Sequence, residues 1–142
     1  MTRRTRAILR ERDLAEAAPI AEQIAVPLLE AAQGDPRPEM QELWATLLAN
    51  AMDPSRRDEV REEFISTLKR LHPTDALILK TMSERFPDRD WVPPHALMSE
   101  GLRQTALDVS LRNLGMNACA DAHNGNYRIT PFGLELVRAC TA

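Results

Sequence analysis

The chain is poor in aromatic residues, which make up 4% of its 142 residues. Its core must therefore be built from Leu, Ile, Ala and Met. No uncharged apolar run approaches the roughly 20 residues that a membrane-spanning helix needs. Arg3, Arg4 and Arg6 stand near the N-terminus, but further charges soon interrupt the next residues, so this segment does not resemble a secretory signal. We expect a protein of the bacterial cytoplasm that does not enter a membrane.

Residues that carry chemistry are also scarce. The two cysteines, Cys119 and Cys140, could form a disulfide, but an intracellular protein favours two buried thiols. Four metal ligands with tetrahedral spacing are missing, and Cys119 and His123 should point in different directions. The chain has no Gly-rich phosphate loop, nucleophile elbow or His-Glu-x-x-His pattern. We predict no metal, no cofactor and no enzymatic activity.

The charge is close to balanced, with a net value of −3. Such a balance gives the chain no general attraction to nucleic acid or to anionic lipid. From Pro73 to the end, 7 Lys and Arg residues stand against 8 Asp and Glu residues. A protein that binds duplex DNA usually needs several phosphate contacts.

What the chain does contain is helical periodicity. Residues 1–18 read as a charged helix with a partial apolar stripe, which could be a nucleic-acid arm or a dimerising helix that needs a partner to cover it. Residues 19–33 continue in helical period, and Pro27 should kink or divide them. The strongest pattern belongs to the next helix, whose apolar positions recur at the spacing of one broad face: Met40, Leu43, Trp44, Leu47, Leu48, Ala51 and Met52.

Three further long helices and one short helix are expected between this helix and the C-terminal tail. The first starts at Ser55 or Asp58 and extends to Leu71. Thr74 should cap the second, which continues to Phe86, and a loop with Trp91 tucked inward comes after it. After a short helix at 95–100, the third spans residues 105–114 and closes at Gly115 as a C-cap. Its outward residues are predicted to be Gln104, Thr105, Asp108, Ser110, Arg112 and Asn113.

The tail predicts a hairpin and then a helix. Asn124-Gly125 favours a tight turn, because both positions of such a turn need positive φ. The weak strand 117–121 precedes it and a strand containing Tyr127 and Ile129 comes after it. Thr130 can then cap a helix that begins at Pro131.

The predicted fold is mainly α: an N-terminal helical segment, then a winged-helix-like domain with a small two-stranded β-hairpin. We place the boundary between residues 1–72 and 73–142. In this arrangement the helix 105–114 takes the position of a recognition helix. The residues that could contact a partner or nucleic acid are Arg103, Gln104, Arg112, Asn113 and Arg128.

The central helix resembles the Abi-alpha (abortive infection alpha) family in the segment from Gln41 to Pro54, QELWATLLANAMDP. Segment 27–32, the stretch 64–79 and the tail 127–133 match in kind, so the resemblance spans roughly residues 20–140. It implies a role in bacterial defence against phage, without established catalytic residues. Family members usually carry a longer N-terminal region, which this chain is expected to lack.

Two functions therefore stand side by side. In the first, the chain is a protein-interaction or oligomerisation module of a phage-defence system, with a protein partner or a second copy of itself. In the second, it is a regulator that binds duplex DNA through Arg103, Arg112 and Arg128. Asn50 is the polar position of the central helix that we single out, and it should bond a neighbouring backbone or serve a partner surface.

Overall fold

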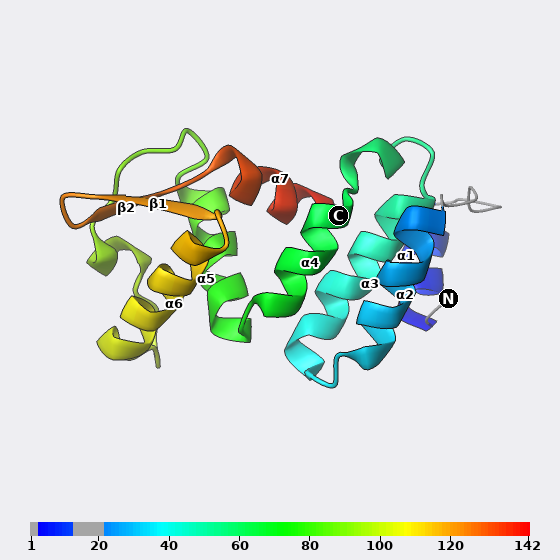
Figure 1. Cartoon of the computed structure of the whole chain (residues 1–142), viewed down its shortest axis with the longest axis horizontal. Coiled ribbons are helices and arrows are strands. Elements are labelled where there is room, and N and C mark those ends of the chain that lie inside the picture. Colours follow the sequence, from blue (N-terminus) through cyan, green and yellow to red (C-terminus); the bar gives the residue numbers. More distant parts are fainter. Residues whose placement is uncertain (1–2, 13–21) are drawn as a thin grey trace. The chain divides into compact units, whose positions relative to one another are not determined.

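The computed structural model describes residues 3–12 and 22–142, and its chain divides into two compact units (Figure 1). The first comprises the described part of Met1–Lys69 together with Arg138–Ala142, and the second comprises Arg70–Val137. The described residues are mainly helical and carry one two-stranded antiparallel hairpin near the C-terminus. This confirms the prediction of a mainly α fold with a small two-stranded hairpin near the C-terminus. None of the described helices is long and apolar enough to cross a membrane.

Helices build the first unit. Its elements in chain order are α1 (Arg3–Glu11), α2 (Glu22–Gly34), α3 (Pro38–Met52), the 3-10 turn η1 (Arg57–Glu59) and α4 (Glu62–Arg70). As the periodicity predicts, α3 lies at the centre of the core, and Trp44 is 1% exposed. Burying such large apolar side chains is the main source of the unit's stability.

Helix α1 lies against α3. Ile8 and Leu9 are buried in a small cluster with Ala45 and Ala49. The described part of this arm's apolar stripe, Ile8 and Leu9, is therefore covered by the chain's own α3, so this part needs no dimer partner. The helix ends at Glu11, and the remainder of the predicted 1–18 helix, residues 13–18, lies outside the described residues.

Two predicted breaks in the first unit differ from the structure. Pro27 does not divide its segment, because α2 runs from Glu22 to Gly34 with Pro27 inside it. The missing N–H costs the helix one backbone bond, and the neighbouring Leu28 is fully buried. The helix expected to start at Ser55 or Asp58 begins at Glu62, because the chain turns to extended backbone at Val60.

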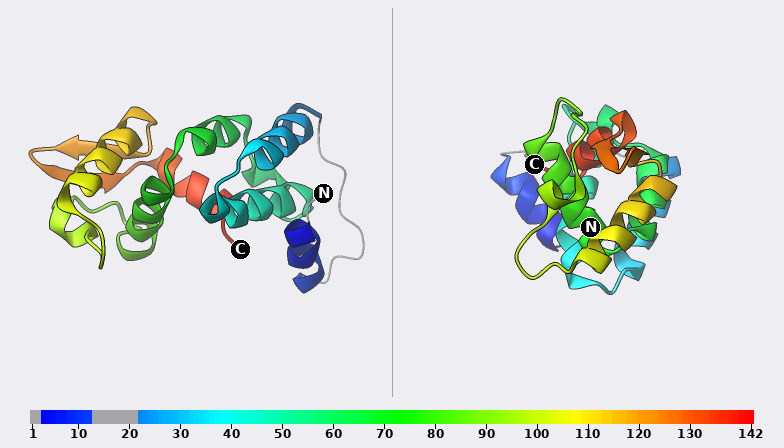
Figure 2. Two further views of the ribbon diagram at one scale, coloured as in Figure 1. Left: turned by 90° about the horizontal axis from the view of Figure 1, so that it is seen from below. Right: turned by 90° about the vertical axis from the view of Figure 1, so that its left-hand side faces the viewer.

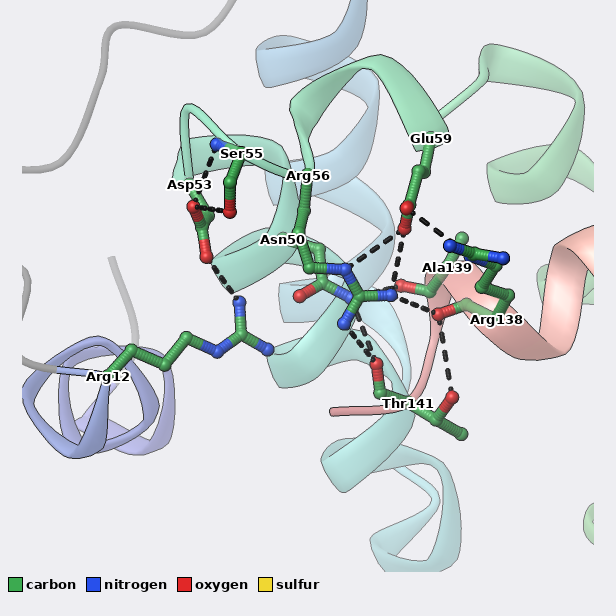
Figure 3. A network of polar contacts seen from close by, with 9 residues as sticks. All are labelled: Arg12, Asn50, Asp53, Ser55, Arg56, Glu59, Arg138, Ala139 and Thr141. Atoms are coloured by element: carbon green, nitrogen blue, oxygen red, sulfur yellow. Dashed lines mark hydrogen bonds and ion pairs between the residues drawn. The ribbon is translucent and has the colours of Figure 1, made fainter.

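The end of the chain is held in the first unit by a polar clasp, formed by Asn50, Arg56 and residues 138–141 (Figure 3). Asn50 is fully buried, and its Nδ2 donates to the carbonyl oxygens of Ala139 (2.7 Å) and Thr141 (3.2 Å). Arg56 donates to the carbonyl oxygens of Arg138 (2.8 Å) and Thr141 (2.9 Å). These donors satisfy carbonyls that a helix leaves unpaired at its C-terminus. The prediction that Asn50 bonds a neighbouring backbone is confirmed.

The second unit places two helices beside the hairpin. Its elements are α5 (Pro73–Arg85), the 3-10 turn η2 (Pro94–Leu97), α6 (Gln104–Met116), β1 (Ala120–His123), β2 (Asn126–Ile129) and the part of α7 (Pro131–Ala139) up to Val137. Both views show the hairpin next to α6 (Figures 1 and 2). The core of this unit includes Leu79, Leu107, Leu111, Leu114 and Ile129.

The hairpin turns at the predicted dipeptide. Asn124 and Gly125 have φ values of 51° and 79°, and the strand register pairs His123 with Asn126 across them. A two-residue turn with both φ values positive matches the right-handed twist of the strands. Thr130 then caps α7, since its Oγ1 accepts from the N–H of Gly133 at 2.9 Å. The predicted hairpin and cap are confirmed, although the first strand is Ala120–His123 and not 117–121.

Trp91 is not tucked inward, because its side chain is 40% exposed. Val92 and Tyr127 exchange two backbone hydrogen bonds of 2.8 Å, which draws this loop into extended pairing with β2. Neighbouring residues of an extended segment point to opposite faces. Val92 is therefore buried and Trp91 faces outward.

The helix ends of the second unit also differ in detail from the prediction. His72, and not Thr74, caps α5: its Nδ1 accepts from the N–H of Thr74 at 3.1 Å. Gly115 does not close α6, which continues to Met116 with Asn117 as its C-cap. The two cysteines are free and buried, as the composition favours.

Candidate interaction groove on helix α6

A groove of about 560 Å³ lies in the second unit, between the start of α5 and one side of α6. Some of the residues that the sequence predicts as partner or nucleic-acid contacts line this groove. Its lining is contributed at one end by the α5 cap and along its length by α6.

Polar contacts fix the α5 end of the groove. Asp75 is 2% exposed and accepts hydrogen bonds from the N–H of His72 (2.9 Å) and from the Asn113 amide. Asn117 in turn donates to the carbonyl oxygen of Asn113 at 2.9 Å. This chain of bonds joins the first turn of α5 to the last turn of α6. The side chain of Asn113, predicted as a partner contact, is thus used within the unit.

The α6 side of the groove is apolar and exposed. Val109 and Met116 line it and are 69% and 73% exposed. Ser110, which the sequence places outward, is buried at 3% exposure. The exposure of Val109 was not predicted from the sequence, although it could have been inferred from the inward positions of Leu107 and Leu111. Two residues turn a helix by about 200°, so a residue two positions after Leu107 faces away from the core.

Two cations flank this apolar surface. Arg103 and Arg112 are exposed and line the groove, and neither forms an ion pair with any described residue. Gln104 lies outside the lining and donates to Asp108 at 3.1 Å. The predicted residues Arg103 and Arg112 are therefore brought to one surface.

Arg128 has a different environment, on β2. Its guanidinium carbon lies 4.3 Å from the ring centroid of Trp91, and its Nε lies 3.3 Å from a carboxylate oxygen of Asp121. Asp121 also lies 3.7 Å from Arg89. A cation stacked on an indole and paired with a carboxylate is less available to a phosphate than an unpaired one. Arg128 is not among the residues that line the groove.

A second hollow, of about 610 Å³, lies in the first unit between α2, the loop after it and α4. Asp35 and Arg37 line it and form an ion pair of 2.7 Å. Hydrogen bonds from Arg37, with a further one from Trp44, hold the pKa of Asp35 well below its ordinary value. The carboxylate is fully occupied by these donors, so it serves to anchor the loop.

The groups available for chemistry are few. Burial raises the pKa of both thiols, Cys119 and Cys140, to about 12, so neither is a thiolate at neutral pH. Among the residues that the structure describes, no group of three or more His, Cys, Asp or Glu side chains is placed to hold a metal ion. The arrangement is suited to binding by shape and charge.

The comparison with protein families gives a match. The model of the family described as abortive infection alpha matches residues 2–96. The match starts closer to the N-terminus than the resemblance read from the sequence, and it ends before α6 and the hairpin. No curated protein and no solved structure matches the chain.

Proposed function

The chain belongs to the abortive infection alpha family, and from this premise we propose that it acts as a non-catalytic module that binds another protein through the α6 groove. Family membership supports an abortive-infection-related role and indicates no known catalytic activity. In this proposal, residues 73–142 bind the partner and residues 1–72 form a separate helical region. The protein acts in the cytoplasm.

The exposed apolar pair on α6 is the observation that carries this proposal. Val109 and Met116 lie seven positions apart on one helix and both line the groove. Large apolar side chains that are left in water gain about 1.5–3 kcal/mol each when a partner buries them. Two of them on one face, beside two arginines that form no ion pair with the described residues, make a surface of the kind that protein partners use.

The test compares capture of a partner by three forms of the full chain in phage-infected cells. The double variant Val109→Glu with Met116→Glu places charge on the apolar surface. The control is Leu77→Glu, because Leu77 is an exposed apolar residue of α5 that does not line the groove. We expect the unmodified chain (the parent) and the control variant to capture the same partner, and the double variant to fail to capture it.

Self-association is the second form of this proposal. Light scattering after size-exclusion chromatography distinguishes the two, because a homo-oligomer forms from the purified chain alone. Dissociation of that oligomer by the double variant would place its contact on α6. A strict monomer that captures nothing, or a double variant that binds as the parent does, would refute the proposed module.

DNA binding remains a second candidate function, supported by the order of elements and by two exposed arginines. Helices α5 and α6 followed by β1 and β2 have the order of a winged-helix domain, in which α6 would be the recognition helix. Arg103 and Arg112 would then contact phosphates. This function predicts a salt-dependent mobility shift of duplex fragments that Arg112→Ala weakens. No shift at low salt would exclude it.

A further inference from the structure

The groove lining on α6 follows a regular helical spacing. Thr105, Val109, Arg112 and Met116 stand at i, i+4, i+7 and i+11 and all line the groove. Residues at this spacing share one face of a helix. At 1.5 Å per residue the stripe is about 16 Å long, or three turns. An occupant that contacts the whole stripe must therefore be an elongated segment.

The free charge along this stripe is positive. Arg103 and Arg112 line the groove without an ion pair among the described residues. Asp75 also lines it, but it is buried and bonded to Asn113. Asp108, the exposed acid of α6, lies outside the lining and accepts from Gln104. A complementary surface would place carboxylates opposite the two arginines.

We propose that the occupant of the α6 groove is an amphipathic helix of a partner protein, with an apolar face over Val109 and Met116 and acidic residues facing Arg103 and Arg112. The inference rests on the proposed function and specifies its partner. Arg103 is the N-cap residue of α6, and Arg112 lies nine positions later on the helix. On the partner helix, acidic residues seven positions apart share one side and are separated by about 10 Å along the axis.

A helix fits this surface better than an extended strand or a DNA duplex. An added strand binds through unpaired backbone groups at a sheet edge, whereas most of the lining residues here lie on α5 and α6. A duplex offers phosphates, which gain nothing from Val109 and Met116, and two cations supply a small share of the usual phosphate contacts. A helix that binds in a groove makes its contacts through side chains at helical spacing, which is also the spacing of the groove-lining residues on α6.

The test measures binding of a labelled peptide to the full chain by fluorescence anisotropy at low salt. The probe is a helical peptide of about 18 residues, long enough to hold helical structure, with Leu on one face and two Glu residues seven positions apart, so that both lie on the same side of the helix. The matched peptide carries Lys in place of both Glu residues. We expect the Glu peptide to bind at least about tenfold more tightly than the Lys peptide.

Variants of the chain then locate the site. Arg103→Gln with Arg112→Gln should weaken the Glu peptide about three- to tenfold, as expected for two exposed charge pairs. Val109→Glu with Met116→Glu should weaken it more than about tenfold, and Leu77→Glu should leave it unchanged. The parent's affinity should fall as salt rises.

Equal binding of the Glu and Lys peptides, no binding of the Glu peptide, or its displacement by duplex DNA would overturn the inference. These failures are distinct from failure of the proposed function. Suppose that the Val109 and Met116 double variant fails to capture the partner while the Glu peptide does not bind the parent. The proposed binding function of the groove then stands, and its occupant is not an acidic amphipathic helix. If the double variant keeps the captured partner, the proposed function itself is wrong.

Discussion

Asp35 connects the loop after α2 to the central helix, and its replacement gives a quantitative test of the first unit. Its Oδ1 accepts from the backbone N–H (3.0 Å) and the Nε (2.8 Å) of Arg37. Its Oδ2 accepts from Arg37 Nη2 (2.7 Å) and from Trp44 Nε1 (2.8 Å). Four donors thus converge on a carboxylate whose side chain is 7% exposed. Asp35→Asn keeps the shape but replaces one acceptor oxygen with an NH₂ group.

The expected cost can be derived from this geometry. Whichever way the new amide is oriented, its NH₂ group faces two of the four donors, so two charge-assisted hydrogen bonds are lost. Each such bond contributes about 1.5–3 kcal/mol, although the half-buried Arg37 can regain part of it from water. We expect a loss of about 2–4 kcal/mol in the free energy of unfolding. At a slope of about 2 kcal/mol/M this lowers the urea midpoint by about 1–2 M.

Tryptophan fluorescence can follow the first unit by itself. The chain has two tryptophans, of which Trp44 lies in the first unit and Trp91 in the second. In a Trp91→Phe background the signal reports Trp44, and Asp58→Asn serves as the control because Asp58 is exposed. A midpoint for Asp35→Asn within about 0.2 M of the control would refute the reasoning.

Acid unfolding gives an independent check with a definite sign. The pKa of Asp35 is lowered in the folded chain, so the unfolded chain binds its proton first as the pH falls. The stabilisation is therefore complete above the ordinary value of 3.8 and decreases as the pH falls below it. The parent's advantage over Asp35→Asn should be constant at neutral pH and shrink below about pH 4. An advantage that grows on acidification would contradict this account.

Three further outcomes are expected. Asn50→Ala should lower the unfolding free energy by about 2–4 kcal/mol in urea titrations, because two carbonyl groups lose a buried donor; a change below about 0.5 kcal/mol would contradict this role. Gly133→Ala should lower the thermal midpoint measured by circular dichroism, since its Cβ would lie 2.5 Å from the carbonyl oxygen of Cys119, while Gly34→Ala meets nothing within 4 Å; equal midpoints would refute the clash. Cys119 and Cys140 should react with a disulfide reagent at pH 8 at least about a hundredfold more slowly in the native chain than in urea; two rapid equivalents would show accessible thiols.

Local patterns were sufficient for much of the fold. The apolar spacing of α3 predicts its burial around Trp44, because a face of a regular helix is fixed by residue spacing alone. The Asn124-Gly125 turn and the Thr130 cap result from backbone preferences that act within four residues. Arg103 at the N-cap of α6 and Arg112 within it were also identified in this way, since their exposure requires no distant contact.

The remaining features depend on residues far apart in the sequence. Propensity and periodicity are local properties, so they predict a mainly helical chain with a terminal hairpin without any knowledge of distant contacts. Tertiary structure alone decided that α3 covers α1, that Asn113 bonds the buried Asp75, and that Arg128 lies on Trp91 beside Asp121. Each of these outcomes is set by which surfaces meet after folding, and that choice depends on the total burial and pairing of the whole unit.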